Sequence, residues 1–314
     1  MLKYLIILLD SSAPSFCHYN IQNKDNGLIS LSDLKKAVKF AMLENLNVQF
    51  VWPDYMLDED YLAVIGSIDH INIASTHLTS QADVVVADSI SELNSIEDGQ
   101  NIIARCTLHE LADNLDCCAA NLDKAAHLSI VFTDLPSWNK DDLATYQRAL
   151  HRLVESIAEK FMKGQRPQLN LLTDRLYLKN MNNCSAGIES LTVGPDGYFY
   201  ICPAFYYFDH QDSRLGKISD PLKIPNNQLY QLDHATICSN CDAWHCRRCI
   251  WLNKTLTREV NTPGKIQCVS SHLEREASRQ LKEKLCSAGV DIRNFSDIKK
   301  LSYLDPFENR MQWT

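Results

Sequence analysis

The sequence has no long hydrophobic run. No apolar segment in its 314 residues approaches the roughly 20 residues that a membrane-spanning helix needs. The apolar start, YLIILLD at 4–10, is short, and Asp10 interrupts it. A signal peptide would carry more charge before the run and an Ala-x-Ala-like cleavage site after it. We therefore predict a buried first strand and a cytoplasmic protein without a membrane span.

An excess of basic charge is also missing. Asp and Glu together number 39 against 31 Lys and Arg, for a formal net charge of -8. A general nucleic-acid binder would need a basic surface for its phosphate contacts. The chain has no internal repeats or low-complexity segments, and its 45% hydrophobic and 22% charged residues are typical of a globular protein. Its length suits one large domain and a smaller one.

Short β-rich runs alternate with amphipathic stretches over the first 175 residues. Strands are predicted at 4–10, 47–52, 70–75, 83–89, 101–107, 127–133 and 168–174. Helices are predicted at 30–45, 58–68, 108–125 and 140–164. The connections at 75–83 and 89–101 are too short for full helices. The pattern predicts an α/β protein with a parallel sheet, either an incomplete (β/α) barrel or an open doubly wound sheet.

Cysteine is unusually abundant and unevenly placed. Of twelve cysteines, five occur up to Cys184 and seven fall between Cys202 and Cys286. In a reducing compartment, clustered cysteines more often bind metal or do redox chemistry than form disulfides. The run 184–202 also reads as a hairpin whose turn, at 194–197, includes a glycine suited to positive φ.

Seven cysteines follow a spacing of metal-site type. They are Cys184, Cys202, Cys238, Cys241, Cys246, Cys249 and Cys268. Seven thiolates exceed the four that one tetrahedral zinc takes, and they come close to the eight that two four-iron, four-sulfur clusters need. Short Cys-x-x-Cys steps place two thiolates on one turn.

This pattern resembles the SPASM domain, the auxiliary-cluster module of radical-SAM peptide and protein maturases. The resemblance covers about 180–275 and rests on Cys184-x12-Gly197-x4-Cys202, the four-cysteine group, the distant Cys268 and RLGKI at 214–218. The group is spaced x2, x4, x2, where the family usually has x2, x5, x3.

The resemblance implies two clusters. Cys184, Cys202 and Cys249 would hold the first, which would have a vacant or non-cysteine fourth position, and Cys238, Cys241, Cys246 and Cys268 the second. A zinc site on Cys238, Cys241, Cys246 and Cys249, beside His245, is the alternative. Structural disulfides do not suit a cytoplasmic protein, and Cys286 is expected to be an ordinary thiol.

A SPASM-like module implies a radical-SAM partial barrel before it. The family's cluster loop, Cys-x3-Cys-x2-Cys after the first strand, aligns with Ala13, Cys17 and Asn20, with Tyr19 at the aromatic position. Its Gly-Gly-Glu-Pro motif aligns with Trp52, Pro53, Asp54 and Tyr55. The resemblance thus implies a degenerate barrel that does not assemble the S-adenosylmethionine (SAM) cluster. An unrelated α/β domain fused to a SPASM-like module is the alternative.

The predicted domains are a barrel at 1–179, a SPASM-like domain at 180–290 and a tail at 291–314. Several other residues have two interpretations. Cys17, beside His18, is either a nucleophile or an ordinary thiol, and Cys117 and Cys118 suit packing better than metal binding. Positive charges near the clusters could favour a reduced cluster or an acidic peptide, or simply be solvated: Arg247, Arg248, Lys254 and Arg258. His109 follows a strand end.

The resemblance extends to the maturases of Cys-x-x-x-repeat peptides, in systems that modify ribosomally made peptides. It implies an accessory component with auxiliary iron–sulfur clusters and no SAM. This component would bind a cysteine-rich precursor peptide, or pair with a true radical-SAM enzyme as a hetero-oligomer. The alternatives are a SAM-independent peptide-modifying enzyme, using Cys17 or the open cluster position, and a zinc-stabilised binding protein.

Overall fold

The computed structural model describes residues 2–20, 27–179, 184–208, 212–246 and 248–298. The chain divides into two compact units. Unit 1 comprises 1–86 and 185–235, and unit 2 comprises 87–184 and 236–314. Each unit therefore combines an early and a late segment of the chain. The domain boundaries expected at 179 and 290 stay a prediction.

Unit 1 is built on a mostly parallel sheet. Its strands are β1 (Tyr4–Leu8), β2 (Asn47–Val51), β3 (His70–Ser75), β4 (Val84–Ala87), β7 (Ser190–Val193), β8 (Tyr198–Tyr200) and β9 (Gly216–Lys217), with β4 ending at the unit boundary. They are ordered β4-β3-β2-β1-β7-β8-β9. The first five in that order pair in parallel, and β8 and β9 pair antiparallel. β1 is central, which explains its continuous apolar sequence.

Helices follow strands in unit 1. α1 (Leu31–Leu43) and α2 (Glu59–Ile65) form as the pattern predicts, whereas α6 (Pro203–Phe208) forms where no helix was predicted. Short 3-10 turns lie at Thr76–Gln81 and Asn227–Tyr230. The α1 helix starts at a Ser30 cap whose side chain accepts the Asp33 N–H. It buries Leu34, Ala37, Val38 and Ala41, the helical spacing of one face.

The cysteine-flanked hairpin forms. β7 pairs antiparallel with β8, and the Gly194 N–H donates to the Tyr198 carbonyl at 3.0 Å. Gly197 has a φ of +75°, and a Cβ there would lie 3.0 Å from the Asp33 carboxylate. A glycine is therefore needed both for the turn and for its close approach to α1.

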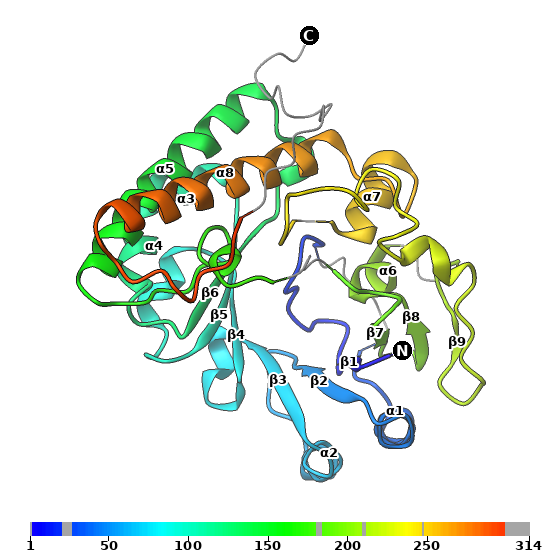
Figure 1. Cartoon of the computed structure of the whole chain (residues 1–314). Coiled ribbons are helices and arrows are strands. Elements are labelled where there is room, and N and C mark those ends of the chain that lie inside the picture. The colour runs from blue at the N-terminus through cyan, green and yellow to red at the C-terminus, as the bar shows by residue number, and fades with distance from the viewer. Residues whose placement is uncertain (1, 21–26, 180–183, 209–211, 247, 299–314) are drawn as a thin grey trace. The chain divides into compact units, whose positions relative to one another are not determined.

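Unit 2 combines a parallel strand pair with long helices. Its elements are β5 (Asn101–Cys106), α3 (Leu108–Asp113), α4 (Leu115–Asn121), β6 (His127–Phe132), α5 (Lys140–Met162), α7 (Ile250–Thr257) and α8 (Lys265–Ser287), with 3-10 turns at Ser91–Ser95, Leu135–Ser137 and Asp174–Leu176. α5 and α8 lie side by side (Figure 1). An Asn139–Asp142 capping box starts α5.

The seventh strand, predicted at 168–174, does not form. Leu169 makes only an isolated bridge to Leu128. Asn170 donates its backbone N–H to the Leu128 carbonyl at 3.1 Å, and its side chain makes the next pairing, accepting the Ile130 N–H at 2.9 Å and donating to the Ile130 carbonyl at 3.0 Å. Because a side chain takes over the pairing to β6 after Leu128, the backbone ladder stops there and the chain turns into the 3-10 helix Asp174–Leu176.

The α/β class and the mostly parallel sheet are confirmed. The two short connections contain 3-10 turns, as their lengths indicated. Among the residues described, no helix is long and apolar enough to cross a membrane.

Candidate metal site

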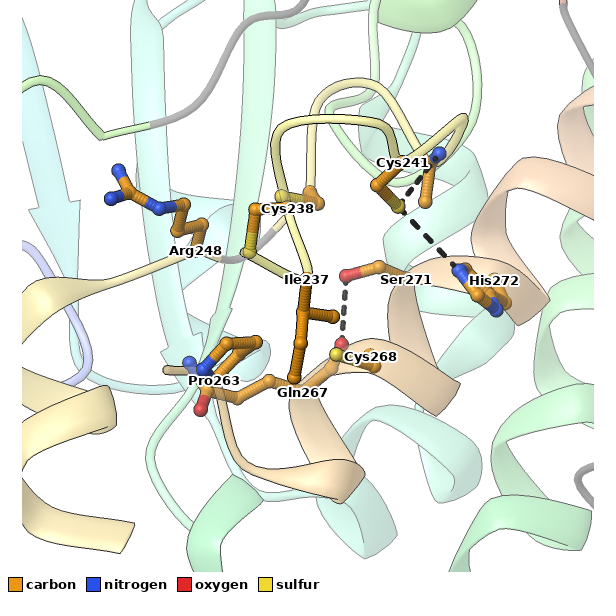
Figure 2. Close-up of a pocket in the computed structure, with 11 residues that line it drawn as sticks. Ile237, Cys238, Cys241, Arg248, Pro263, Gln267, Cys268, Ser271 and His272 are labelled. Atoms are coloured by element: carbon orange, nitrogen blue, oxygen red, sulfur yellow. Dashed lines mark hydrogen bonds between the residues drawn. The ribbon is translucent and has the colours of Figure 1, made fainter. Parts of the chain in front are cut away.

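Four cysteines from two segments of unit 2 line one cavity (Figure 2). Cys238, Cys241 and Cys246 come from the loop before α7, and Cys268 lies on the first turn of α8. These are the four residues assigned to the second cluster by resemblance. Arg248 and His272 also line the cavity, whose volume is about 30 Å³.

Local hydrogen bonds shape the two segments. The Cys241 N–H donates to the Cys238 carbonyl at 3.1 Å, which closes the Cys-x-x-Cys turn. The Ala243 N–H donates to Cys241 Sγ at 3.3 Å. At the start of α8, the Gln267 side chain accepts the Gly264 N–H at 2.7 Å, which places Cys268 one turn into the helix.

A buried ion pair fastens the cysteine loop to α8. Arg175 donates to the Glu274 carboxylate at 2.7 Å, and both side chains are almost fully buried. The same guanidinium donates to the Trp244 and His245 carbonyls, each at 2.9 Å. Tyr146 on α5 donates to the other Glu274 oxygen at 2.6 Å. Because one guanidinium binds both the helix and the loop backbone, it fixes their spacing.

Two further carboxylates hold the loop. Asp242 forms a buried ion pair with Arg275 of α8. Asp174 lies 3.0 Å from His127 Nε2 and 3.1 Å from His245 Nε2. Burial acts to raise the pKa of Asp174, but the hydrogen bonds from the two histidines outweigh it and hold that pKa well below its usual range.

Burial makes two of the cavity thiols weaker acids. It raises the pKa of Cys238 to about 11; the neighbouring Cys246 adds to this, and the Arg248 guanidinium opposes it. Burial also raises the pKa of Cys241 to about 12, against the hydrogen bond from Ala243. A bound metal cation would have to displace these protons, because the thiolate is the metal ligand.

The donor set suits a soft metal. Four sulfurs and one imidazole favour iron–sulfur clusters or zinc over the oxygen-seeking calcium and magnesium. A tetrahedral zinc with Zn–S bonds of about 2.3 Å would hold its sulfurs about 3.8 Å apart. Among the described residues, the only trio of potential ligand atoms within 4.8 Å of one another is Cys241, Asp242 and His272. The four sulfurs are thus more widely spaced than one zinc requires.

The remaining predicted ligands divide between the units. Cys249, which belongs to the zinc alternative, is not among the cavity's lining residues; Cys268 is. Burial raises the pKa of Cys249 to about 12, and the charge of Cys184 adds to this. Both residues belong to unit 2. Cys184 is exposed, and Cys202 in unit 1 is half-buried.

The loop after β1 is closely packed. Ala13 is fully buried, and its carbonyl accepts the Tyr207 hydroxyl at 3.4 Å. Tyr19, 1% exposed, stacks on Tyr207 with ring centroids 5.4 Å apart. The Ser15 hydroxyl donates to the Tyr19 carbonyl at 2.5 Å. Of the positions aligned with the cluster loop, Cys17 is half-buried and Asn20 is exposed.

The residue that follows β2 is a buried tryptophan. Trp52 is 1% exposed, and its Nε1–H donates to Asn72 Oδ1 of β3 at 2.8 Å. Pro53 is buried and Asp54 is exposed. The Tyr55 hydroxyl donates to Asp10 Oδ2 at 2.7 Å, which ties this segment to the end of β1.

Other residues considered from the sequence lie elsewhere. His109 is exposed and 3.3 Å from Asp142. Cys118 is buried and Cys117 half-buried, in keeping with packing. Arg248 is buried in the cavity, whereas Lys254 and Arg258 are exposed. Arg247 lies outside the described residues.

Sequence reasoning missed three contributors to the site: His272, Arg175 and Glu274. For His272 a signal existed, because the spacing Cys268-x3-His272 would place two ligand-type side chains on one face of a helix. Arg175 and Glu274 are 99 residues apart, and nothing local links them.

The fold of this chain is similar to that of several solved structures. Two structures of anSMEcpe with bound AdoMet match it with TM-scores of 0.64 and 0.62, at 16% and 15% identity. The matches cover 92% and 91% of this chain, and 96% and 99% of the other. A structure of anSMEcpe with AdoMet and the Cp18Cys peptide matches with a TM-score of 0.62 at 17% identity, over 91% of this chain and 99% of that one. No protein-family model and no curated protein matches the sequence.

Proposed function

We propose that this chain is a component of a peptide-maturation system that carries auxiliary iron–sulfur clusters. The observation that carries this proposal is the convergence of Cys238, Cys241, Cys246 and Cys268 on one cavity. Their sulfurs would bind the four irons of one [4Fe-4S] cluster. Cys184, Cys202 and Cys249 would hold a second cluster within a SPASM-like module.

The chain does not assemble a SAM cluster in this proposal. Ala13 and Asn20 offer no thiolate, and Ala13 is fully buried. Trp52 fills, with an indole hydrogen-bonded to Asn72, a position where the family has a small glycine that admits SAM. The protein would therefore be a degenerate member of the radical-SAM fold, kept for its clusters and its binding surfaces.

Its substrate or partner would be a peptide or a peptide-modifying enzyme. AdoMet and a peptide are bound together in one of the anSMEcpe structures with the same fold. We propose that this chain binds a cysteine-rich precursor peptide, pairs with a true radical-SAM enzyme, or does both. Electrons could then pass between its clusters and that enzyme.

Metal analysis and SAM cleavage test this function together. Protein made anaerobically is expected to be brown, with about eight irons per chain. Reconstituted protein is expected to yield no 5′-deoxyadenosine from SAM. Two zincs and no iron would contradict the cluster proposal, and robust SAM cleavage would contradict the degenerate barrel.

A SAM-independent peptide-modifying enzyme is the second candidate, because Cys17 is only half-buried in the loop after β1. Under this alternative, Cys17→Ala would abolish peptide modification while leaving fold and iron content intact. Under the accessory role, the same variant would keep modification in the presence of the partner enzyme.

A further inference from the structure

His272 is the fifth potential ligand in a cavity that already has four cysteines. It lies four residues after Cys268 on α8, so both side chains project from one face of the helix (Figure 2). Its Nε2 points at Cys241 Sγ, 3.8 Å away, and the residue is 2% exposed. Four thiolates are enough to bind the four irons of a cluster, so the imidazole is not needed as a ligand and is placed to hydrogen-bond to a sulfur.

The direction of this contact follows from metal binding. A metal-bound thiolate carries no proton, so its sulfur only accepts hydrogen bonds. The imidazole must then carry its proton on Nε2 and donate it. Cys241 Sγ already accepts the Ala243 N–H at 3.3 Å, so it would receive two donors.

Hydrogen bonds to cluster sulfurs are among the factors that set a reduction potential, together with charge and solvent exposure. Each donor stabilises the more negative, reduced state more than the oxidised state. Burial strengthens the effect, because the local dielectric is low. Arg248, which is also buried and lines the cavity, adds a positive charge beside Cys238.

We propose that His272 donates its Nε2–H to the metal-bound thiolate of Cys241 and thereby makes the cluster in this cavity easier to reduce. This inference rests on the proposed function, since it needs an iron–sulfur cluster at this site. Reduction adds one electron to the cluster from an external donor, and no protein bond forms or breaks. His272 is a positioning residue that makes this cluster suited to electron transfer.

The experiment is a redox titration of the full-length, cluster-loaded protein with dithionite, followed by electron paramagnetic resonance. His272→Phe removes the donor and keeps a ring of similar size, whereas His272→Gln keeps an N–H near the same place. Ser270→Ala, at another buried position of α8, is the control for general disturbance of the helix.

We expect one of the two cluster potentials to fall in His272→Phe and to return most of the way in His272→Gln. Ser270→Ala should leave both potentials where they are. Protein carrying ¹⁵N-labelled histidine should show a weak nitrogen coupling to this cluster, absent from His272→Phe. This coupling tests the contact in the unmodified chain even if His272→Phe does not fold.

Three results would overturn the inference. Unchanged potentials in a His272→Phe protein that keeps all its iron would leave the proposed function standing and remove the role of His272. A strong coupling of directly bound nitrogen would make His272 a ligand instead. Absence of iron from the unmodified protein would refute the proposed function and this inference with it.

Discussion

The family resemblance assigns metal clusters to two regions of the molecule, the loop after β1 and the cysteine cavity. The two regions differ in how their side chains are packed. In unit 1, the loop after β1 packs Ala13 and Tyr19 into the interior, and Trp52 occupies the end of β2. In unit 2, four cysteines surround a cavity. The loop is stabilised by its own packing, whereas the cavity brings together thiols of the kind that bind metals.

Under the proposed function, the difference teaches that a fold can outlast one of its cofactor sites. Stacked aromatic rings and buried hydrogen bonds, such as the stack of Tyr19 on Tyr207, would then stabilise the loop in place of a metal. At the proposed cluster site, buried ion pairs would hold the loop in position around the cluster. Arg175 and Glu274 form one such pair in unit 2.

Loss of one cavity cysteine should have the largest effect. Cys268→Ala is expected to remove one cluster, so that iron falls from about eight to about four per chain. Cys286→Ala, an exposed thiol on the same helix, is the matched control and should keep all the iron. Iron and sulfide analysis measures both. Full iron content in Cys268→Ala would mean that the cavity does not hold a cluster through this residue.

Removal of the buried Glu274 carboxylate should have the second-largest effect. Glu274→Ala leaves the Arg175 guanidinium buried without its ion-pair partner, and we expect a loss of about 3–5 kcal/mol in the free energy of unfolding. Glu283→Ala, which changes an exposed carboxylate of α8, should cost less than about 0.5 kcal/mol. Chemical denaturation of both variants gives the two values. Equal values would show that the ion pair does not hold the loop.

Cysteines introduced at positions 13 and 20 would test whether the loop after β1 can hold a cluster as the cavity is proposed to do. In Ala13→Cys/Asn20→Cys, the fully buried position 13 would be overpacked, at a cost of about 1–3 kcal/mol. Iron should stay at about eight per chain, because a cluster cannot enter a filled site. A rise to about twelve irons would show that the loop can still open around a metal.

The smallest effect is expected at the hydrogen bond that joins the segments following β1 and β2. Tyr55→Phe removes the hydroxyl that donates to Asp10, while the Ser12 backbone and side chain still donate to the same carboxylate. We expect a loss of about 1 kcal/mol, measured by thermal or chemical unfolding. Tyr4→Phe, at an exposed position of β1, is the comparison. A loss of several kcal/mol would mean that this one bond holds the loop.

Much of the fold was predictable because the local signals agree with it. Strands such as β1 are continuous apolar runs, and α1 starts at a Ser30 cap with an apolar face at helical spacing. The strand predicted at 168–174 was wrong, because its LNLL sequence has the apolar composition of a strand. Its fate depends on Asn170, whose side chain pairs with Ile130 forty residues away.

The site was predictable only in part, for a related reason. Cysteine spacing identifies the candidate ligands, because thiolates have few other reasons to cluster in this way. It does not reveal that Arg175 reaches the backbone of the cysteine loop, since that contact joins positions about 70 residues apart. Contacts of this kind depend on the tertiary fold, which short-range patterns do not encode.

The α8 helix fixes the relative positions of several side chains around the cavity. It presents Cys268 and His272 on one face, and Glu274 and Arg275 to the two ion pairs of the cysteine loop. Each residue of a helix advances the axis by about 1.5 Å and turns it by about 100°. A single insertion between 268 and 272 would therefore rotate the donor and both ion pairs away together, although every side chain would still be present. The order of residues along this one helix sets the site's chemistry as firmly as their identity does.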